Sequence, residues 1–271
     1  MDPLENTIPY EDQLSLVKEF GKTILDNLWK FGDFMGFVGK FFYWLVRPPY
    51  RVSLFFEQFN FIGNKSLFII CLSGSFTGMV MAYQTYFGFK IINVDSLVGP
   101  VVAITLAKEL GPVLSGLIIA GRCGAAMAAQ IGSMKVTEQI DALEVMGINS
   151  IQYLAVTRIA AATIAMPLLV AIFQFVGNIG SYIIGTQVFL IDEAIYYSKL
   201  SDFMYLEDIW QGLIKSVFFG FTIACIGTFC GFNVEKGAEG VGRATNLAVV
   251  WGMITVLISD YFLTSFLVKI L

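Results

Sequence analysis

The sequence contains no histidine and few charged residues. Only 14% of its 271 residues are charged, whereas soluble domains have about 25%. The absence of histidine excludes a histidine-ligated metal site and a histidine proton relay. The four cysteines lie in apolar stretches and none forms a Cys-x-x-Cys pair, which indicates small buried side chains.

Motifs for nucleotide binding and catalysis are also missing. No Gly-x-x-x-x-Gly-Lys-Ser/Thr loop occurs, so the chain does not bind ATP by that route. No nucleophilic triad or metal cluster is apparent, and we predict that the chain is not an enzyme and needs no cofactor of its own. The net charge of −4 argues against nucleic acid as a partner.

Long apolar runs dominate what is present, because 56% of the residues are hydrophobic. A helix needs about 20 residues to cross the hydrocarbon core of a bilayer. Five segments meet that length, at roughly 67–89, 98–132, 155–186, 211–233 and 246–269. We expect Pro112 and Pro167 to bend the long second and third segments. The sequence predicts an all-α, polytopic integral membrane protein with five transmembrane helices.

Residues 13–46 predict a further helix of a different kind. Apolar side chains, among them Val17, Phe20 and Ile24, recur every three or four positions, and lysines occupy other faces. This pattern is typical of a helix in the plane of the membrane surface, although packing on a partner protein would also explain it. Pro48 and Pro49 should end it. We therefore divide the chain into residues 1–50, with the interfacial amphipathic helix, and residues 51–271, with the five spans.

The distribution of basic residues predicts the orientation. Seven lysines and arginines lie between residues 18 and 65, and the connections near 122–158 and 236–243 are also basic. The positive-inside rule places these segments and the N-terminus in the cytoplasm, so five crossings place the C-terminus outside. The acidic segment 192–208 then becomes an external loop.

Small residues repeat every fourth position in two spans. One stripe lies on the first span at Gly74, Gly78 and Ala82. The second stripe consists of Gly116, Ala120, Gly124, Ala128 and Gly132. Such stripes let another helix backbone approach closely. They serve either packing within one protomer or an interface between subunits, and the sequence does not separate the two.

Four ionisable residues fall inside or near the apolar segments: Lys108, Glu109, Lys215 and Asp260. A charge at the bilayer centre costs on the order of 2.5–3.5 kcal/mol, so these side chains should face a partner or a wet cavity. Adjacent helical residues point about 100° apart, so Lys108 and Glu109 should not simply pair with each other. A cross-helix contact between Glu109 and Lys215 is one prediction. The alternative is that Lys215 extends to the membrane interface and Asp260 caps a buried polar group.

The connection 134–147 has the pattern of a short amphipathic helix. Met134, Ile140, Leu143 and Met146 can share one apolar side. Thr137 is a candidate cap at its start, and Gly147 is a candidate for its end. On the cytoplasmic side, such a helix would suit docking of a soluble partner, although an ordinary surface helix would show the same pattern.

Several motifs together resemble one family, and they run in order from about residue 50 onward. They are KELGPV (108–113), AGR (120–122), GAA (124–126), IGSMKVTEQIDALEVMG (131–147), GAEGVGRAT (237–245) and DYFLT (260–264). This pattern closely resembles the MlaE (YrbE-like) family of ABC-transporter permeases.

The resemblance implies a permease that forms a homodimer in the inner membrane and assembles with a cytoplasmic ABC ATPase and an MCE-domain lipid-binding protein. It implies transport of phospholipid or a related lipid between membranes, with ATP bound by the partner. By position, Lys108, Glu109, Lys215 and Asp260 match polar residues of the family's lipid cavity and membrane region. The residues Glu138, Gln139, Asp141 and Glu144 match the helix that couples to the ATPase. One departure is Gln130, where the family usually has Glu.

The working hypothesis is a cavity between two copies of the chain. Acyl chains would contact Leu72, Phe76 and Met79 on the first span, and the head group would meet Lys108 and Glu109. An ion-coupled secondary transporter that uses Glu109 and Asp260 is one rival, although no inverted repeat is apparent. A membrane scaffold that transports nothing is another.

Overall fold

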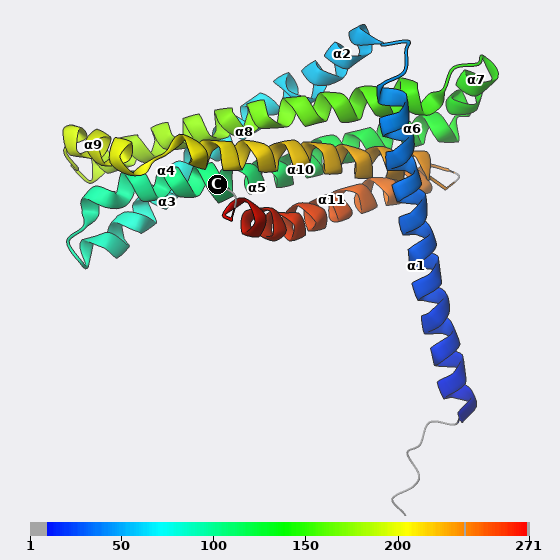
Figure 1. Cartoon of the computed structure of the whole chain (residues 1–271), viewed down its shortest axis with the longest axis horizontal. Coiled ribbons are helices and arrows are strands. Elements are labelled where there is room, and N and C mark those ends of the chain that lie inside the picture. The colour runs from blue at the N-terminus through cyan, green and yellow to red at the C-terminus, as the bar shows by residue number, and fades with distance from the viewer. Residues whose placement is uncertain (1–9, 236, 270–271) are drawn as a thin grey trace, which may run out of the picture. The chain divides into compact units, whose positions relative to one another are not determined.

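The computed structural model describes residues 10–235 and 237–269, and within these residues the regular elements are helices, with no strand. Five helical stretches are long and apolar enough to cross a membrane (Figure 1). They are Val52–Lys90, Asp95–Val136, Ile151–Val188, Leu206–Phe232 and Ala238–Leu267. The predicted all-α architecture with five spans is therefore confirmed.

The chain divides into two compact units, and the first comprises residues 1–47. It contains α1 (Tyr10–Leu45), which ends before Pro48 as the sequence predicts. At its end the guanidinium of Arg47 lies 4.0 Å from the centre of the Tyr43 ring. The side chains of Val17, Phe20 and Ile24 lie outside the described residues. The position of α1 on a membrane surface stays a prediction.

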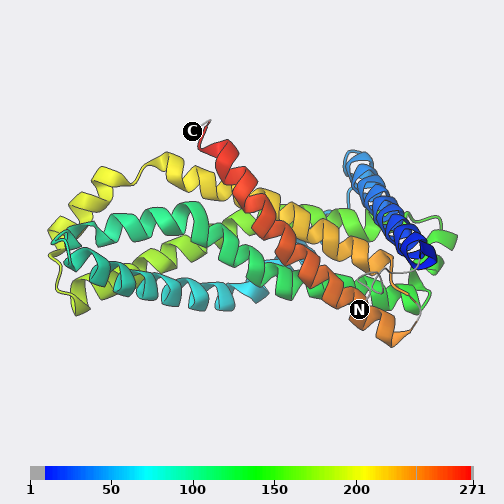
Figure 2. The ribbon, with the colours of Figure 1, turned by 90° about the horizontal axis from the view of Figure 1, so that it is seen from below.

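The second unit, residues 48–271, contains the five spans. Its α-helices are α2 (Val52–Ile62), α3 (Asn64–Lys90), α4 (Val98–Thr105), α5 (Gly111–Ile119), α6 (Ala125–Val136), α7 (Gln139–Val145), α8 (Thr157–Ile183), α9 (Glu193–Phe203), α10 (Leu206–Phe232) and α11 (Ala238–Leu267). A 3₁₀ turn, η1 (Asp95–Leu97), opens the second span. Four π-helical turns interrupt the second and third spans: η2 (Leu106–Leu110), η3 (Ala120–Gly124), η4 (Ile151–Val156) and η5 (Ile184–Val188). In this unit α7 and α9 lie at opposite ends, and α11 runs obliquely across the bundle (Figures 1 and 2).

The two prolines predicted to bend the long spans differ in their surroundings. Pro112 stands in the first turn of α5, directly after the π turn η2, where the helical hydrogen-bond ladder is irregular. Pro167 lies within α8, which continues as an α-helix on both sides of it. Pro112 therefore adjoins one of the two π turns that interrupt the second span, whereas the helix around Pro167 is regular.

Glycines allow α3 and α8 to cross with their backbones in contact. A Cβ atom added to Gly74 would lie 2.8 Å from the carbonyl oxygen of Phe173. A Cβ atom added to Gly78 would overlap the carbonyl group of Gly177. The first stripe of small residues therefore packs within the protomer, against α8, because membrane helices associate through close packing of small residues.

The second small-residue stripe faces α10 and α11 of the same chain. A Cβ atom added to Gly116 would lie 3.1 Å from Val256 Cγ1, and one added to Gly132 would lie 2.7 Å from Val234 Cγ2. The carbonyl oxygen of Ala128 would likewise lie 3.1 Å from a Cβ atom at Gly231. Of the two alternatives for Gly116, Ala120, Gly124, Ala128 and Gly132, the structure supports packing within one protomer.

The short helix predicted in the connection 134–147 exists as α7, but its start differs from the prediction. Thr137 does not cap α7, because it ends α6 and its hydroxyl donates to the Ser133 carbonyl at 2.9 Å. Glu138 precedes α7 with a φ of 60° and makes no side-chain cap. Gly147 ends α7 as predicted, with a φ of +74°, and Ile148 N–H donates to the Leu143 carbonyl at 3.0 Å.

The apolar side of this connection is smaller than predicted. Ile140 is buried against Ile131 and Leu154, and Met134 and Leu143 pack on the same cluster. Met146 is instead 64% exposed, because it follows the end of α7 and takes no part in this cluster. The inclusion of Met146 in the packed side was therefore wrong.

The connection after the third span is a docked helix rather than the predicted loop. Tyr196 of α9 is buried, and its hydroxyl lies 3.1 Å from Ser181 Oγ. Gly99 and Gly185 leave room for the Tyr196 ring. Burial raises the pKa of Tyr196, with the Ser181 hydrogen bond opposing the shift, so this hydroxyl stays neutral around pH 7.

The helix crossing at Gly78 makes a test of the packing. We expect Gly78→Ala to lower the free energy of unfolding by about 1–3 kcal/mol, because the methyl group would force α3 and α8 apart. Gly88→Ala on the same helix is the matched control, because nothing lies within 4 Å of the added atom. Thermal unfolding of the purified chain in detergent measures both. Equal stability of the two variants would contradict the close crossing.

Candidate functional site

The π turn η2 makes two backbone carbonyl groups available inside the second span. The N–H of Gly111 donates to the carbonyl of Leu106, five residues back, instead of to Ala107. Pro112 has no N–H to offer to Lys108, four residues back. The carbonyls of Ala107 and Lys108 are thereby left to other helices. π-helical turns within α-helices often occur at functional sites.

Side chains from α8 and α10 donate hydrogen bonds to these two free carbonyl groups. Gln174 of α8 donates through Nε2 to the Ala107 carbonyl at 2.9 Å. Lys215 of α10 donates through Nζ to the Lys108 carbonyl at 3.0 Å. Gly212 makes room, since a Cβ atom there would overlap the Ala107 carbonyl. The proline and glycines around η2 therefore hold three spans in one arrangement.

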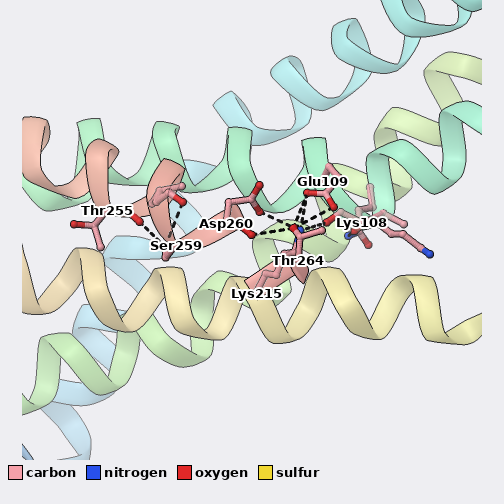
Figure 3. Close-up of polar contacts among 10 residues, drawn as sticks. Lys108, Glu109, Lys215, Thr255, Ser259, Asp260 and Thr264 are labelled. Atoms are coloured by element: carbon pink, nitrogen blue, oxygen red, sulfur yellow. Dashed lines mark hydrogen bonds and ion pairs between the residues drawn. The ribbon is translucent and has the colours of Figure 1, made fainter. Parts of the chain in front are cut away.

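The ammonium group of Lys215 is the centre of the site (Figure 3). It contacts Glu109 Oε2 at 2.6 Å and Asp260 Oδ1 at 3.0 Å, in addition to the backbone carbonyl. The contacts with Glu109 and the Lys108 carbonyl are hydrogen bonds, whereas the contact with Asp260 is an ion pair that leaves Asp260 Oδ1 buried without a hydrogen-bond donor. The Lys215 side chain is only 1% exposed. The predicted contact between Glu109 and Lys215 is confirmed, and the alternative in which Lys215 extends to the interface is excluded.

The carboxylates around Lys215 are more open than the ammonium group itself. The Glu109 side chain is 38% exposed and that of Asp260 is 21% exposed. Thr264, one turn after Asp260, places its hydroxyl 3.3 Å from both Glu109 oxygens. The site is therefore sealed on the lysine side and accessible on the carboxylate side, where oxygens remain available to a hydrogen-bond donor.

A second ion pair lies beside the first. Lys108 Nζ contacts Asp208 Oδ1 at 2.7 Å, with the two side chains 30% and 7% exposed. The other Asp208 oxygen accepts the N–H of Tyr205 at 2.9 Å, at the start of α10. As predicted, Lys108 and Glu109 do not pair with each other. The placement of Asp208 in an external loop was wrong, because it lies buried within α10.

Three participants were not among the predicted site residues. Asp208 lies seven residues before Lys215, and this spacing puts both on one face of a helix. Thr264 lies four residues after Asp260, so these two residues also share one face of a helix. Both spacings were visible in the sequence. Gln174 had no such signal, because its contact depends on the carbonyl that the π turn releases.

The remaining predicted cavity residues lie elsewhere on the protomer. Leu72 and Phe76 on α3 are 46% and 59% exposed. Met79 is half-buried, and its Cγ lies 3.2 Å from the position of a Cβ atom on Gly180. The structure therefore joins Lys108, Glu109, Lys215 and Asp260 and places the three apolar residues on α3. A shared cavity stays a prediction.

The predicted coupling residues form an exposed surface. Glu138, Gln139, Asp141 and Glu144 are all exposed on or beside α7. Glu144 also accepts a hydrogen bond from Ser150 at 2.7 Å, which ties α7 to the start of the third span. Gln130, the departure from the family pattern, accepts a long hydrogen bond of 3.4 Å from Arg158 Nη2.

The site offers polar binding rather than covalent chemistry. The described parts of the chain contain no group of three or more cysteine, aspartate or glutamate side chains that would hold a metal ion. Its five charged groups carry a net charge of −1 when all are ionised, from two lysines and three carboxylates. Such a mixed arrangement suits a ligand that carries both a donor and an anionic group.

The buried ion pairs predict a large effect of removing the lysine. We expect Lys215→Ala to lower the free energy of unfolding by about 3–5 kcal/mol, because Glu109 and Asp260 would lose their shared partner. Lys199→Ala is the control, since Lys199 is 41% exposed in a 3.9 Å pair, and it should change stability by less than about 1 kcal/mol. Denaturant unfolding in mixed micelles measures both. Comparable losses in the two variants would argue against the buried network.

Comparisons with known proteins agree with this architecture. The family model described as permease MlaE matches residues 55–266. A probable ABC transporter permease protein of Rickettsia bellii is 40% identical over 259 residues, covering 95% of this chain and 99% of the relative. The intermembrane phospholipid transport system permease protein MlaE of Haemophilus influenzae is 33% identical over 255 residues, covering 93% and 97%.

Another relative comes from a plant. The chloroplast protein trigalactosyldiacylglycerol 1 of Arabidopsis thaliana is 34% identical over 210 residues, covering 78% of this chain and 60% of the relative. The family match includes the whole of the Lys215 site, from η2 to Thr264. The chain therefore belongs to the MlaE family of ABC-transporter permeases.

Proposed function

We propose that this chain moves phospholipid, or a closely related lipid, between membranes as the permease subunit of an ABC transporter. The name of the Haemophilus relative, an intermembrane phospholipid transport permease, supports this substrate class. The observation that carries the proposal is the Lys215 site, in which a buried lysine contacts two partly exposed carboxylates inside the membrane spans. Ionisable groups in spans mark substrate pathways by default, because they are expensive to keep there.

The chemistry of the site fits a phospholipid head group. Glu109 and Asp260 offer carboxylate oxygens to an amine or hydroxyl group. Lys108 is 30% exposed and offers N–H donors to a phosphate. Acyl chains would lie on the apolar surface of α3 that includes Leu72 and Phe76. The lipid cavity then requires both the polar site and this apolar surface.

A homodimer would bring these two surfaces together. In one protomer α3 and α11 expose large apolar side chains, among them Phe76, Trp251 and Phe262 at 55–65% exposure. Lipid or a second copy of the chain would cover them. An opening between two copies would give a cavity that is apolar along its walls and charged where Glu109 and Asp260 face it.

The distribution of basic residues supports an orientation for the chain, and α7 offers a surface on which an ATPase would dock. We place the N-terminus and α7 in the cytoplasm and the C-terminus in the periplasm, with the chain in the inner membrane. At the end of α7, Val145 and Met146 are 89% and 64% exposed beside the acidic residues. A cytoplasmic ABC ATPase would dock here and bind the ATP, so this chain needs no cofactor or enzyme activity of its own. An MCE-domain protein would receive or deliver lipid on the other side.

Transport follows if ATP hydrolysis changes the affinity of the cavity for lipid. A movement at α7 would reach the site through α6, whose stripe of small residues packs on α10 and α11. These two helices carry Lys215 and Asp260. If ATP hydrolysis switches the chain between two states with different lipid affinities, lipid would bind in one state and be released from the other.

Photo-crosslinking in the assembled transporter tests this proposal. A photo-reactive residue in place of Phe76 should capture labelled phospholipid in an ATP-dependent manner, because cargo passes this surface only during turnover. The control position is Ile164 on α8, which is 53% exposed. There capture should come from bulk membrane lipid and should not respond to ATP.

Two outcomes would reject the proposal. Capture at position 76 that is as insensitive to ATP as capture at position 164 would place Phe76 outside the lipid path. Lipid transfer that persists without the ATPase and collapses with the proton gradient would instead favour an ion-coupled transporter.

A further inference from the structure

A polar pocket lies at the end of the bundle where the second span ends and the third begins. Its volume is about 820 Å³, which is within the range of ligand sites. Its walls come from α2, α3, α6 and α8 and from the first residue of α7. It contains no residue of the Lys215 site. The pocket is therefore separate from the site proposed to hold the transported lipid.

The wall of this pocket includes a buried cation without a carboxylate partner. Arg158 at the start of α8 is 7% exposed, and among the described residues it has no acidic group within ion-pair distance. Its Nη1 donates to the Leu154 carbonyl at 2.9 Å and its Nη2 to Gln130 at 3.4 Å, but its Nε is buried without an acceptor. A buried guanidinium in this state lacks both a counter-charge and a full set of acceptors.

The charges near the pocket are predominantly positive. Lys65 also lines it, and its Nζ lies 5.3 Å from the centre of the Phe61 ring. The guanidinium of Arg122 lies 5.4 Å from the centre of the same ring. The one carboxylate in the wall is Glu57, which is exposed and acts on Arg158 only through space. The pocket wall therefore contains two cations, Lys65 and Arg158, against one carboxylate, and a third cation, Arg122, lies beside Phe61.

We propose that this pocket binds a phosphate-bearing anion, held by Arg158 and Lys65. The planar guanidinium matches the geometry of phosphate oxygens, and the amides of Gln58 and Gln130 add hydrogen-bond donors in the same wall. A lipid head group is the favoured source, because the pocket is lined by the second half of α2, the last turns of α6 and the first turn of α8, near the ends of the second and third spans. The inference goes beyond the transport proposal and does not depend on lipid transfer.

A binding experiment with opposite charge changes tests this site. The full-length chain in a neutral detergent is titrated with dihexanoyl phosphatidylglycerol, with inorganic phosphate and with dihexanoylglycerol as the uncharged reference. Gln130→Glu supplies Arg158 with an internal carboxylate, so it should weaken phosphatidylglycerol binding by about tenfold or more. Glu57→Gln removes the competing carboxylate, so it should tighten binding.

Controls and outcomes distinguish the possible ligands. Asp202→Asn on α9, an exposed change at the other end of the bundle, should leave binding unchanged. Binding of phosphatidylglycerol but not of inorganic phosphate, with the two opposite responses, would support a lipid head-group site. Binding of both with these responses would support a site for phosphate from either source. No binding, or binding that neither pocket variant alters, would overturn the proposal, and the exposed Glu57→Gln change keeps the test valid if Gln130→Glu fails to fold.

Discussion

The arrangement of the spans depends on satisfying one ammonium group where water is scarce. Lys215 donates to a backbone carbonyl in η2 and to Glu109, and it forms an ion pair with Asp260. These partners belong to the second and fifth spans, whereas the lysine belongs to the fourth. A buried ion pair of this kind is weak evidence for stability, but removing one partner is costly because the other charge is left buried and unpaired. The same geometry leaves the carboxylates half-open, which connects the fold to lipid binding.

Backbone features make this arrangement possible. Pro112 and Gly111 release the carbonyls of Ala107 and Lys108, and Gly212 lets α10 approach them. The hydrophobic effect does not drive helices together inside a bilayer. They associate instead through close packing and buried hydrogen bonds. The glycine contact between α3 and α8 and the small-residue stripe facing α10 and α11 follow the same logic. A movement at α7 therefore has a packed route to the charged site.

The sequence predicted the fold well because an apolar run of about 20 residues crosses a bilayer as an α-helix. The five spans, the helix at 139–145 with its glycine end and the Glu109–Lys215 contact all followed from spacing and hydropathy. It predicted less where tertiary contacts decide. Thr137 ended α6 instead of capping α7, Met146 was exposed, and Asp208 lay in α10 as the partner of Lys108. The π turns were not predicted, and without them the role of Gln174 was not visible.

The central claim is that the charges at the half-open site act on lipid rather than only on stability. The most direct measurement is lipid transfer by the reconstituted transporter carrying Lys215→Met, Glu109→Gln and Asp260→Asn together. The three replacements remove the charges together and nearly keep the side-chain volumes, so no buried charge of the triad is left unpaired and the complex should assemble and hydrolyse ATP. The account predicts that lipid transfer is lost in this variant. Transfer at the rate of the unaltered transporter would contradict it.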